Sequence, residues 1–139
     1  MKKALILYNS KTGTTKRFAL EIAEFLKKNN LDTTVASIFE FESNDTGDFE
    51  YVLLGCWTSG LMIFLQHPER VWVEFSEQLP DLGGKKIGLF TTYTIATGSM
   101  FKQMRKHVQC NPNDIAMELK SRNGELIEPI RKRLLEFIL

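Results

Sequence analysis

The 139-residue sequence has only two cysteines, two histidines and four prolines, and it has no long apolar run. Cys56 and Cys110 lack the paired spacing of metal-binding or disulfide-exchange motifs, so we expect free thiols in a reducing compartment. Two histidines are too few ligands for a metal centre without such cysteines. The first apolar run is too short for a signal sequence and no segment is long enough to span a bilayer, so we expect a cytoplasmic protein without membrane contact.

An excess of charge of one sign is also lacking. The sequence has 18 basic and 17 acidic residues and a net charge of +1. This balance gives no whole-protein case for nucleic acid as a partner. Basic groups at residues 102–106 and 131–133 are interpreted as solvated helix faces.

The sequence does contain an alternation of apolar runs and helical patterns across one predicted domain of residues 1–139. Strands are predicted at 4–8, 32–38, 49–55, 85–90 and 114–119. Apolar residues three or four apart predict helices around 18–26, 71–79, 101–108 and 126–137. Loops are predicted at 38–48, 56–61 and 91–97, and the first of them contains at most a short helix. This order indicates an α/β three-layer sandwich, in which a five-stranded parallel sheet of order 2-1-3-4-5 has helices on both faces.

Small hydroxylated residues fill the turn between the first strand and the first helix. The turn contains Ser10, Lys11, Thr12, Gly13, Thr14 and Thr15. The first amides of a helix have no partner within the helix and carry partial positive charge, so a phosphate fits there. The hydroxyls add donors, and Gly13 lets a ligand approach the backbone closely. One or two hydroxyls suffice to cap a helix, so at least four favour a phosphate site over an ordinary capped turn.

The pattern of this turn differs from two common phosphate loops. It lacks the Gly-Lys-Ser/Thr ending of nucleotide hydrolases, and it has one glycine where the dinucleotide fingerprint has three. Instead, Ser10, Thr12, Gly13 and Thr15 form a Ser-x-Thr-Gly-x-Thr pattern that resembles the phosphate loop of the flavodoxins. The resemblance extends over nearly the whole chain, and it implies a flavodoxin-like fold and a noncovalently bound FMN.

The resemblance also implies that two further loops meet the first one and flank the flavin ring. In flavodoxins, the backbone beside a glycine in the second loop bonds flavin N5 and flips on reduction, and Gly60 would permit this flip. The second loop consists of Cys56, Trp57, Thr58, Ser59 and Gly60. The third loop supplies Thr91, Thr92, Tyr93, Thr94, Ile95 and Gly98.

Two departures from the flavodoxin pattern concern the flavin ring. Ile95 stands where flavodoxins usually place a stacking aromatic residue; Trp57 and Tyr93 are the aromatic candidates, and each is equally compatible with ordinary packing. No Asp or Glu occurs at 58–67 or 91–101, whereas flavodoxins often surround the flavin with acids. We therefore expect the second electron to enter at a less negative potential than is usual for the family.

Three features beside these loops have plainer interpretations. Cys56 is interpreted as a small packed residue, because nothing in the sequence lowers the pKa of its thiol. His67 directly precedes Pro68 and is interpreted as a helix-start residue. The apolar segment 61–65 is either a partner surface or, as we favour, is buried or packs against the dimethylbenzene edge of the flavin.

Other uses of the same fold fail on specific residues. A phosphatase loop needs an arginine six residues after its cysteine, and Met62 stands there after Cys56. A two-component receiver needs acids after the first strand and an aspartate after the third, and Asn9 and Cys56 occupy those ends.

The sequence and the resemblance together predict an FMN-binding carrier that moves single electrons between a reductase and an acceptor enzyme, which are its transient partners. The flavin supplies the redox chemistry, so no side chain needs to act as an acid or base. Two alternatives stay open. One is an NAD(P)H-dependent flavin or quinone reductase with an open flavin face, and the other is a noncatalytic module of the same fold.

Overall fold

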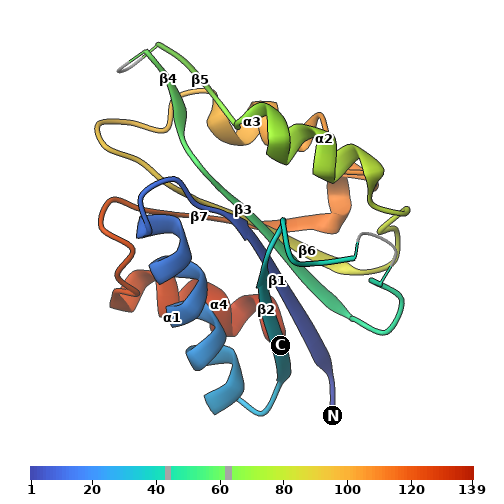
Figure 1. Cartoon of the computed structure of the whole chain (residues 1–139). Helices are drawn as coiled ribbons and strands as arrows, with labels where there is room; N and C mark the ends of the chain where they lie inside the picture. The colour runs from blue at the N-terminus through green and yellow to red at the C-terminus, as the bar shows by residue number, and fades with distance from the viewer. Residues whose placement is uncertain (43–44, 62–63) are drawn as a thin grey trace.

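The chain folds around one five-stranded parallel sheet of order β2-β1-β3-β6-β7, and a separate hairpin pairs β4 with β5 (Figure 1). The computed structural model describes residues 1–42, 45–61 and 64–139. The strands are β1 (Lys3–Asn9), β2 (Asp32–Ser37), β3 (Tyr51–Trp57), β4 (Ser59–Leu61), β5 (Phe64–His67), β6 (Lys86–Thr92) and β7 (Ile115–Ser121). The helices are α1 (Thr14–Lys28), α2 (Arg70–Gln78), α3 (Met100–Arg105) and α4 (Glu128–Ile138), with a 3-10 turn at Pro112–Asp114.

The predicted α/β fold class is confirmed. Counted within the sheet alone, the strands follow the order 2-1-3-4-5, and the unpredicted hairpin shifts the labels of the last two strands. Within the described residues, no helix is both long and apolar enough to cross a membrane. The assignment of residues 1–139 to a single domain stays a prediction.

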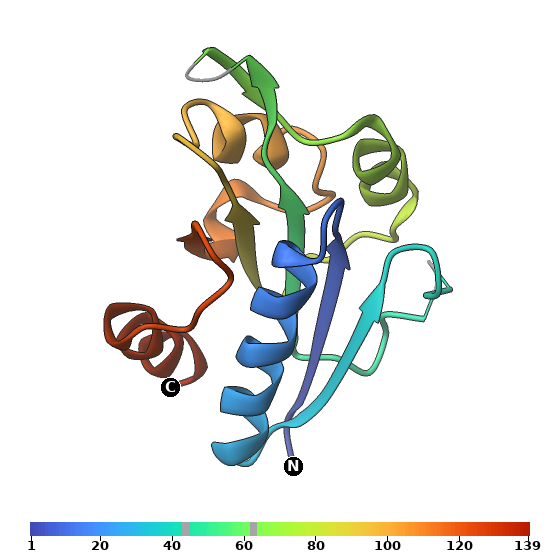
Figure 2. The same cartoon turned by 60° about the vertical axis from the view of Figure 1, so that its left-hand side comes forward.

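Helices cover both faces of the sheet, as Figures 1 and 2 show. On one face, α1 and α4 share a core with the sheet, and α1 buries Phe18, Ile22 and Leu26 at helical spacing. On the other face, α2 contributes the fully buried Trp72 and α3 contributes Met100. Because both faces are covered, the central strands are apolar throughout instead of alternating.

Four strands, β1, β3, β6 and β7, extend further at their carboxyl ends than the sequence predicted, and in β3 and β6 the added residues are predicted site residues. β3 continues through Cys56 to Trp57, and β6 continues through Thr91 to Thr92. The register pairs Cys56 with Thr91 and Trp57 with Thr92. These four residues were predicted to lie in loops, which is wrong. The apolar runs stop earlier, but ladder hydrogen bonds continue into polar sequence and satisfy the backbone there.

The hairpin between β3 and α2 corrects three further predictions. Residues 59–61 form a strand instead of the end of a loop, and α2 begins at Arg70 with Glu69 at its N-cap. His67 therefore ends β5 and is not a helix-start residue. Leu65 has 70% of its surface exposed, so the expectation of burial is wrong for this residue. Residues 62 and 63 of the same apolar segment lie outside the described residues.

An aromatic ring from β6 packs over a glycine of β3 in the middle of the sheet. Gly55 and Phe90 are paired across the strands, and a Cβ atom on Gly55 would lie only 2.1 Å from Cε2 of Phe90. Phe90 in turn meets Phe18 of α1 edge to face, with ring centroids 5.8 Å apart. Because glycine has no side chain, the Phe90 ring can lie over Gly55 and pack against α1 behind the β1–α1 turn.

Replacing Gly55 with alanine is expected to lower the free energy of unfolding by about 1–3 kcal/mol, because the added methyl group overpacks against a rigid buried ring. Chemical denaturation measures the effect. Gly88→Ala is the matched control: its methyl group would meet Cε of Met117, which is the movable end of a flexible side chain. Equal losses in the two variants would contradict this account.

Candidate functional site

A pocket of about 270 Å³ opens at the carboxyl ends of the parallel strands. This is the edge at which ligands bind in open α/β sheets. The pocket is built from the β1–α1 turn, the end of β3, the segment after β6 and the residue after β7. Its lining consists of Lys11, Thr12, Thr14, Trp57, Thr58, Thr92, Tyr93, Thr94 and Arg122. Eight of these nine residues are predicted site residues, and Arg122 is not.

The β1–α1 turn presents open backbone donors. Gly13 has φ of 96°, a left-handed conformation that glycine adopts at low cost, and it precedes the first turn of α1. The hydroxyl of Ser10 accepts hydrogen bonds from the amides of Gly13 (3.1 Å) and Lys16 (3.2 Å). Within the described residues, the amides of Thr14 and Thr15 have no acceptor. The turn is therefore held in shape by Ser10 while its free amides remain available for an anion.

The predicted hydroxyl donors divide into two groups. Thr12 and Thr14 line the pocket. Thr15 is only 1% exposed, and its hydroxyl is hydrogen-bonded to that of Thr92 across the start of the pocket. Thr15 therefore braces the site from inside and Ser10 holds the shape of the turn, whereas Thr12 and Thr14 are the hydroxyl side chains of the turn that line the pocket.

A second pair of threonines links β3 to β6. The Thr91 hydroxyl donates to the carbonyl of Cys56 (2.6 Å), so its single hydrogen is used. The contact of 2.8 Å between the Thr58 and Thr91 hydroxyls is therefore a bond that Thr58 donates. As a consequence, the Thr58 hydroxyl can offer only lone pairs to a ligand in the pocket, whereas Thr91 is buried beneath it.

Two aromatic side chains flank the pocket, and each lies close to cationic groups. The ammonium of Lys11 lies 4.8 Å from the centroid of the Trp57 ring. The ammonium of Lys120 lies 6.0 Å, and the guanidinium carbon of Arg122 5.7 Å, from the centroid of the Tyr93 ring. These distances are those of cation–π contacts. No carboxylate belongs to the pocket lining in the described part of the chain.

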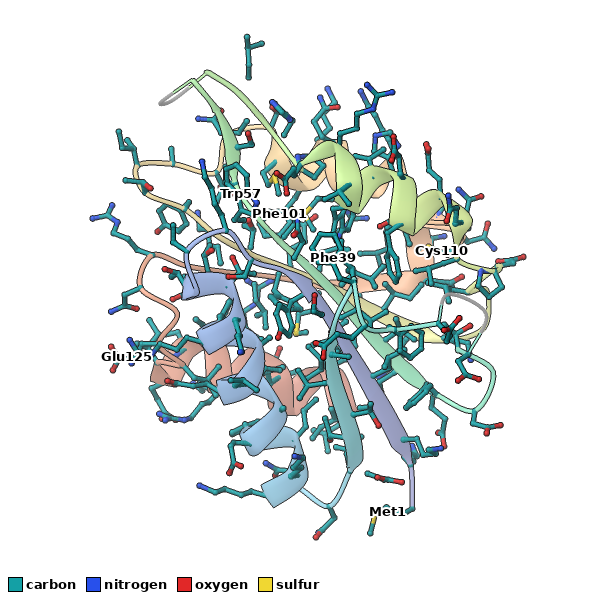
Figure 3. All side chains as sticks on the ribbon, in the orientation of Figure 1. Met1, Phe39, Trp57, Phe101, Cys110 and Glu125 are labelled. Carbon is teal, nitrogen blue, oxygen red and sulfur yellow. The ribbon has the colours of Figure 1, made fainter. Side chains whose placement is uncertain are left out.

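One carboxylate nevertheless lies directly behind the pocket. Glu69 Oε1 accepts hydrogen bonds from the side-chain amide of Asn9 (2.7 Å) and from the indole N–H of Trp57 (3.3 Å). It thereby ties the ends of β1 and β3 to the start of α2. The segment 58–67, which contains no Asp or Glu, ends two residues before Glu69. Figure 3 marks Trp57 at this end of the sheet.

Cys56 does not reach the pocket. Its side chain is fully buried in the α2–α3 core, and its sulfur accepts a hydrogen bond from the Asn9 amide at 3.6 Å. Burial raises the pKa of the Cys56 thiol to about 12. The packing interpretation of this cysteine agrees with its surroundings, and the raised pKa argues against a reactive thiolate.

We expect Cys56 to be inert to thiol reagents such as Ellman's reagent at pH 8 in the folded protein, while the part-exposed Cys110 reacts. Burial also raises the pKa of Cys110, so its reaction is expected to be slower than that of a free thiol. Two reactive thiols in the native protein would contradict the prediction that Cys56 is inert.

The raised pKa of Cys56 also affects the pH dependence of stability. In the unfolded state the thiol has a pKa of about 8.5, so above that pH the unfolded state loses a proton that the folded state keeps. The contribution of the Cys56 thiol to the free energy of unfolding is therefore present below about pH 8.5 and is lost as the pH rises towards about 12.

Besides Ser10, Gly13, Thr15, Cys56 and Thr91, four further predicted site residues do not line the pocket. Ser59 and Gly60 belong to β4. Ile95 does not line the pocket and is 50% exposed. Gly98 lies against the side chain of Gln66 in β5. Sequence reasoning did not identify Arg122 and Glu69 as site residues. The only feature of the sequence that could have indicated them is their position next to predicted elements: Arg122 directly follows β7, and Glu69 precedes α2.

The arrangement suits a planar ligand that carries a phosphate. Free amides and two threonine hydroxyls lie at the N-terminus of α1, and aromatic rings lie at the pocket walls. Within the described residues, no group of three His, Cys, Asp or Glu side chains could hold a metal ion. Among the described lining residues, only Lys11, Tyr93 and Arg122 have ionisable side chains. The residues present therefore fit FMN as a bound group. The protein would bind the FMN and set the electrostatic environment of its ring.

Comparison with known proteins agrees with this site. Residues 5–119 match the family model for the flavodoxin domain. Among relatives, a flavodoxin of Maridesulfovibrio salexigens is 30% identical over 105 residues, which are 72% of each chain. The solution structure of two-electron reduced Megasphaera elsdenii flavodoxin superposes with a TM-score of 0.78 and 26% identity, covering 96% of each chain. The chain belongs to the flavodoxin family.

Proposed function

We propose that this protein binds one FMN noncovalently in the pocket and carries single electrons between a reductase and an acceptor enzyme. The observation that carries the proposal is the β1–α1 turn, in which the amides of Thr14 and Thr15 are left without acceptors beside the pocket. FMN, when bound, would supply the redox chemistry. Family membership supports the cofactor, and the redox partners are part of the proposal.

The residues of the pocket have distinct roles in this proposal. Thr12, Thr14 and the free amides bind the phosphate at the N-terminus of α1. Trp57 and Tyr93 both line the pocket and orient the ring system through aromatic contact. Thr58 offers an acceptor to the ring edge. None of these roles requires a side chain to give or take a proton.

The first test is titration of the purified protein with FMN, followed by stepwise reduction without oxygen. Binding is expected to shift the visible flavin spectrum and quench its fluorescence. Two separate one-electron transitions would support the carrier. A single two-electron transition, together with bleaching by NAD(P)H alone, would favour the reductase instead. Absence of any binding of FMN or riboflavin would contradict the proposal and leave a noncatalytic module.

The charges around the pocket predict the potential of the second electron. Lys11 and Arg122 line the pocket, and among the described residues no carboxylate does, so the reduced anion meets less repulsion than in a pocket rimmed with acids. Arg122→Gln is expected to make the second potential more negative by about 20–40 mV, which corresponds to about 0.5–1 kcal/mol for one partly solvated charge. Lys28→Gln, at the far end of α1, is the control. A very low second potential in the unaltered protein would contradict the prediction.

A further inference from the structure

We propose that the cationic rim of the pocket is a docking surface for an acidic protein partner. The cationic rim is defined here as Lys11, Lys120 and Arg122. The inference deepens the proposed electron-carrier function and depends on it for the role of the partner. The proposed partner is a protein with a negatively charged contact surface.

The cationic rim is distinguished by its position: Lys11 and Arg122 line a pocket whose described lining contains no carboxylate, and Lys120 lies beside it over the same Tyr93 ring as Arg122. In the described residues, none of its three side chains forms an ion pair. By contrast, Arg105 pairs with Glu118 at 2.7 Å, and Arg131 pairs with Glu128 at 3.6 Å. Uncompensated charge of one sign around a pocket attracts and orients a partner of the opposite sign.

The three cations are also held in place. Lys11 lies over Trp57, and both Lys120 and Arg122 lie over Tyr93. All three side chains are exposed. Cation–π contacts restrain the side chains without neutralising their charge, so less conformational entropy is lost when a partner binds. The charge is therefore presented at the two aromatic walls, where a redox partner must approach a bound flavin.

The surface beside the rim favours a protein over a small anion. Lys120 lies outside the pocket lining, so a ligand confined to the pocket would leave it unused. Two exposed apolar side chains, Ile95 (50%) and Leu65 (70%), lie in the segment after β6 and in the β4–β5 hairpin. These two segments are neighbours at the same end of the molecule (Figures 1 and 2), and the Ser99 hydroxyl donates a hydrogen bond to the carbonyl of Gln66 in β5. A few apolar contacts beside complementary charges are typical of a transient protein interface.

The five acids of residues 40–50 do not offset this charge. None of them lines the pocket. Glu69, a carboxylate close to Trp57, is engaged by hydrogen bonds from Asn9 and Trp57. The near-neutral net charge of +1 therefore conceals a local positive surface at the site.

The test compares two small redox proteins of opposite charge as probes of the ¹⁵N-labelled chain, with and without FMN. The acidic probe is a plant-type ferredoxin and the basic probe is cytochrome c. We expect ferredoxin to perturb the amide signals of residues 11–16, 93–95 and 120–123, and to bind more weakly as salt is raised. We expect cytochrome c to leave these signals unchanged.

Matched variants identify the charges responsible. Lys120→Gln/Arg122→Gln is expected to weaken ferredoxin binding by roughly two- to thirtyfold at low salt, as loss of two exposed ion pairs implies. Lys27→Gln/Lys28→Gln removes the same charge from the opposite end of α1 and is expected to change binding less than twofold, roughly, because separated exposed charges are screened. Native-like spectra of both variants verify folding.

Three results would overturn the inference. They are binding of cytochrome c at the rim, binding of ferredoxin at α3 or α4 instead of the rim, and equal weakening in the two double variants. Failure of the proposed function is separate, because it is a failure to bind FMN. A chain that binds ferredoxin at the rim but never FMN would keep the docking surface and lose the electron carrier.

Discussion

Replacing Thr12 and Thr14 together with alanine is expected to lower the affinity for FMN about a hundredfold, while the affinity for riboflavin changes little. The two ligands differ only in the phosphate. Both threonines line the pocket at the start of α1, whereas Ser10 and Thr15 are engaged in hydrogen bonds within the protein. A hydrogen bond to a charged group contributes about 1.5–3 kcal/mol, so two such bonds account for about two orders of magnitude or more.

Fluorescence titration of the apoprotein with each flavin measures this effect. Thr34→Ala on β2 is the control, since Thr34 is an exposed threonine outside the pocket. If FMN and riboflavin lose affinity equally, the threonines support the ring or the fold instead of the phosphate. If neither ligand loses affinity, the backbone amides alone hold the phosphate.

Replacing Glu69 with alanine is expected to lower the free energy of unfolding by about 1–3 kcal/mol and to loosen Trp57 at the pocket wall. The carboxylate accepts hydrogen bonds from both Asn9 and Trp57, and Asn9 is only 2% exposed. Without Glu69, a buried amide donor has no strong acceptor, which carries a cost of that size. We also expect FMN to bind about tenfold more weakly, since a stacking aromatic contact contributes on the order of 1 kcal/mol.

A second substitution separates the hydrogen bonds of Glu69 from its charge. Glu69→Gln keeps an acceptor oxygen, so stability and affinity should change less than in the alanine variant. It removes a negative charge behind the pocket, so both flavin potentials should become less negative by roughly 20–40 mV. Glu74→Ala is the control on the same helix, because Glu74 forms only an exposed pair with Arg70.

The indole N–H resonance of Trp57 provides a readout that does not depend on flavin. It is expected to shift in the alanine variant, where its acceptor is lost, and to shift less in the glutamine variant. In the described residues the indole N–H of Trp72 has no hydrogen-bond partner, so the two signals report different environments. An unchanged Trp57 signal in Glu69→Ala would show that Glu69 does not position the ring.

The sequence by itself determined the sheet, the hydroxyl-rich β1–α1 turn and the family. Uninterrupted apolar runs mark strands that are buried on both faces, and the spacing of Phe18, Ile22 and Leu26 marks α1. The Ser-x-Thr-Gly-x-Thr turn was recognisable because its function depends on local chemistry: free amides, hydroxyls and one left-handed glycine. Local patterns of this kind can be interpreted without knowing the rest of the chain.

Tertiary structure decided which residues surround the pocket and which only support it. Arg122 reaches the pocket because β7 lies beside β6, and Glu69 meets Asn9 across 60 residues of sequence. Thr15 and Thr91 have the same side chain as Thr12 and Thr14, yet burial places them behind the site. The β4–β5 hairpin and the extra residues of β3 and β6 depend on pairing with distant strands. Contacts between residues far apart in the chain leave no periodic signal in a single sequence, and for that reason the fold alone decided them.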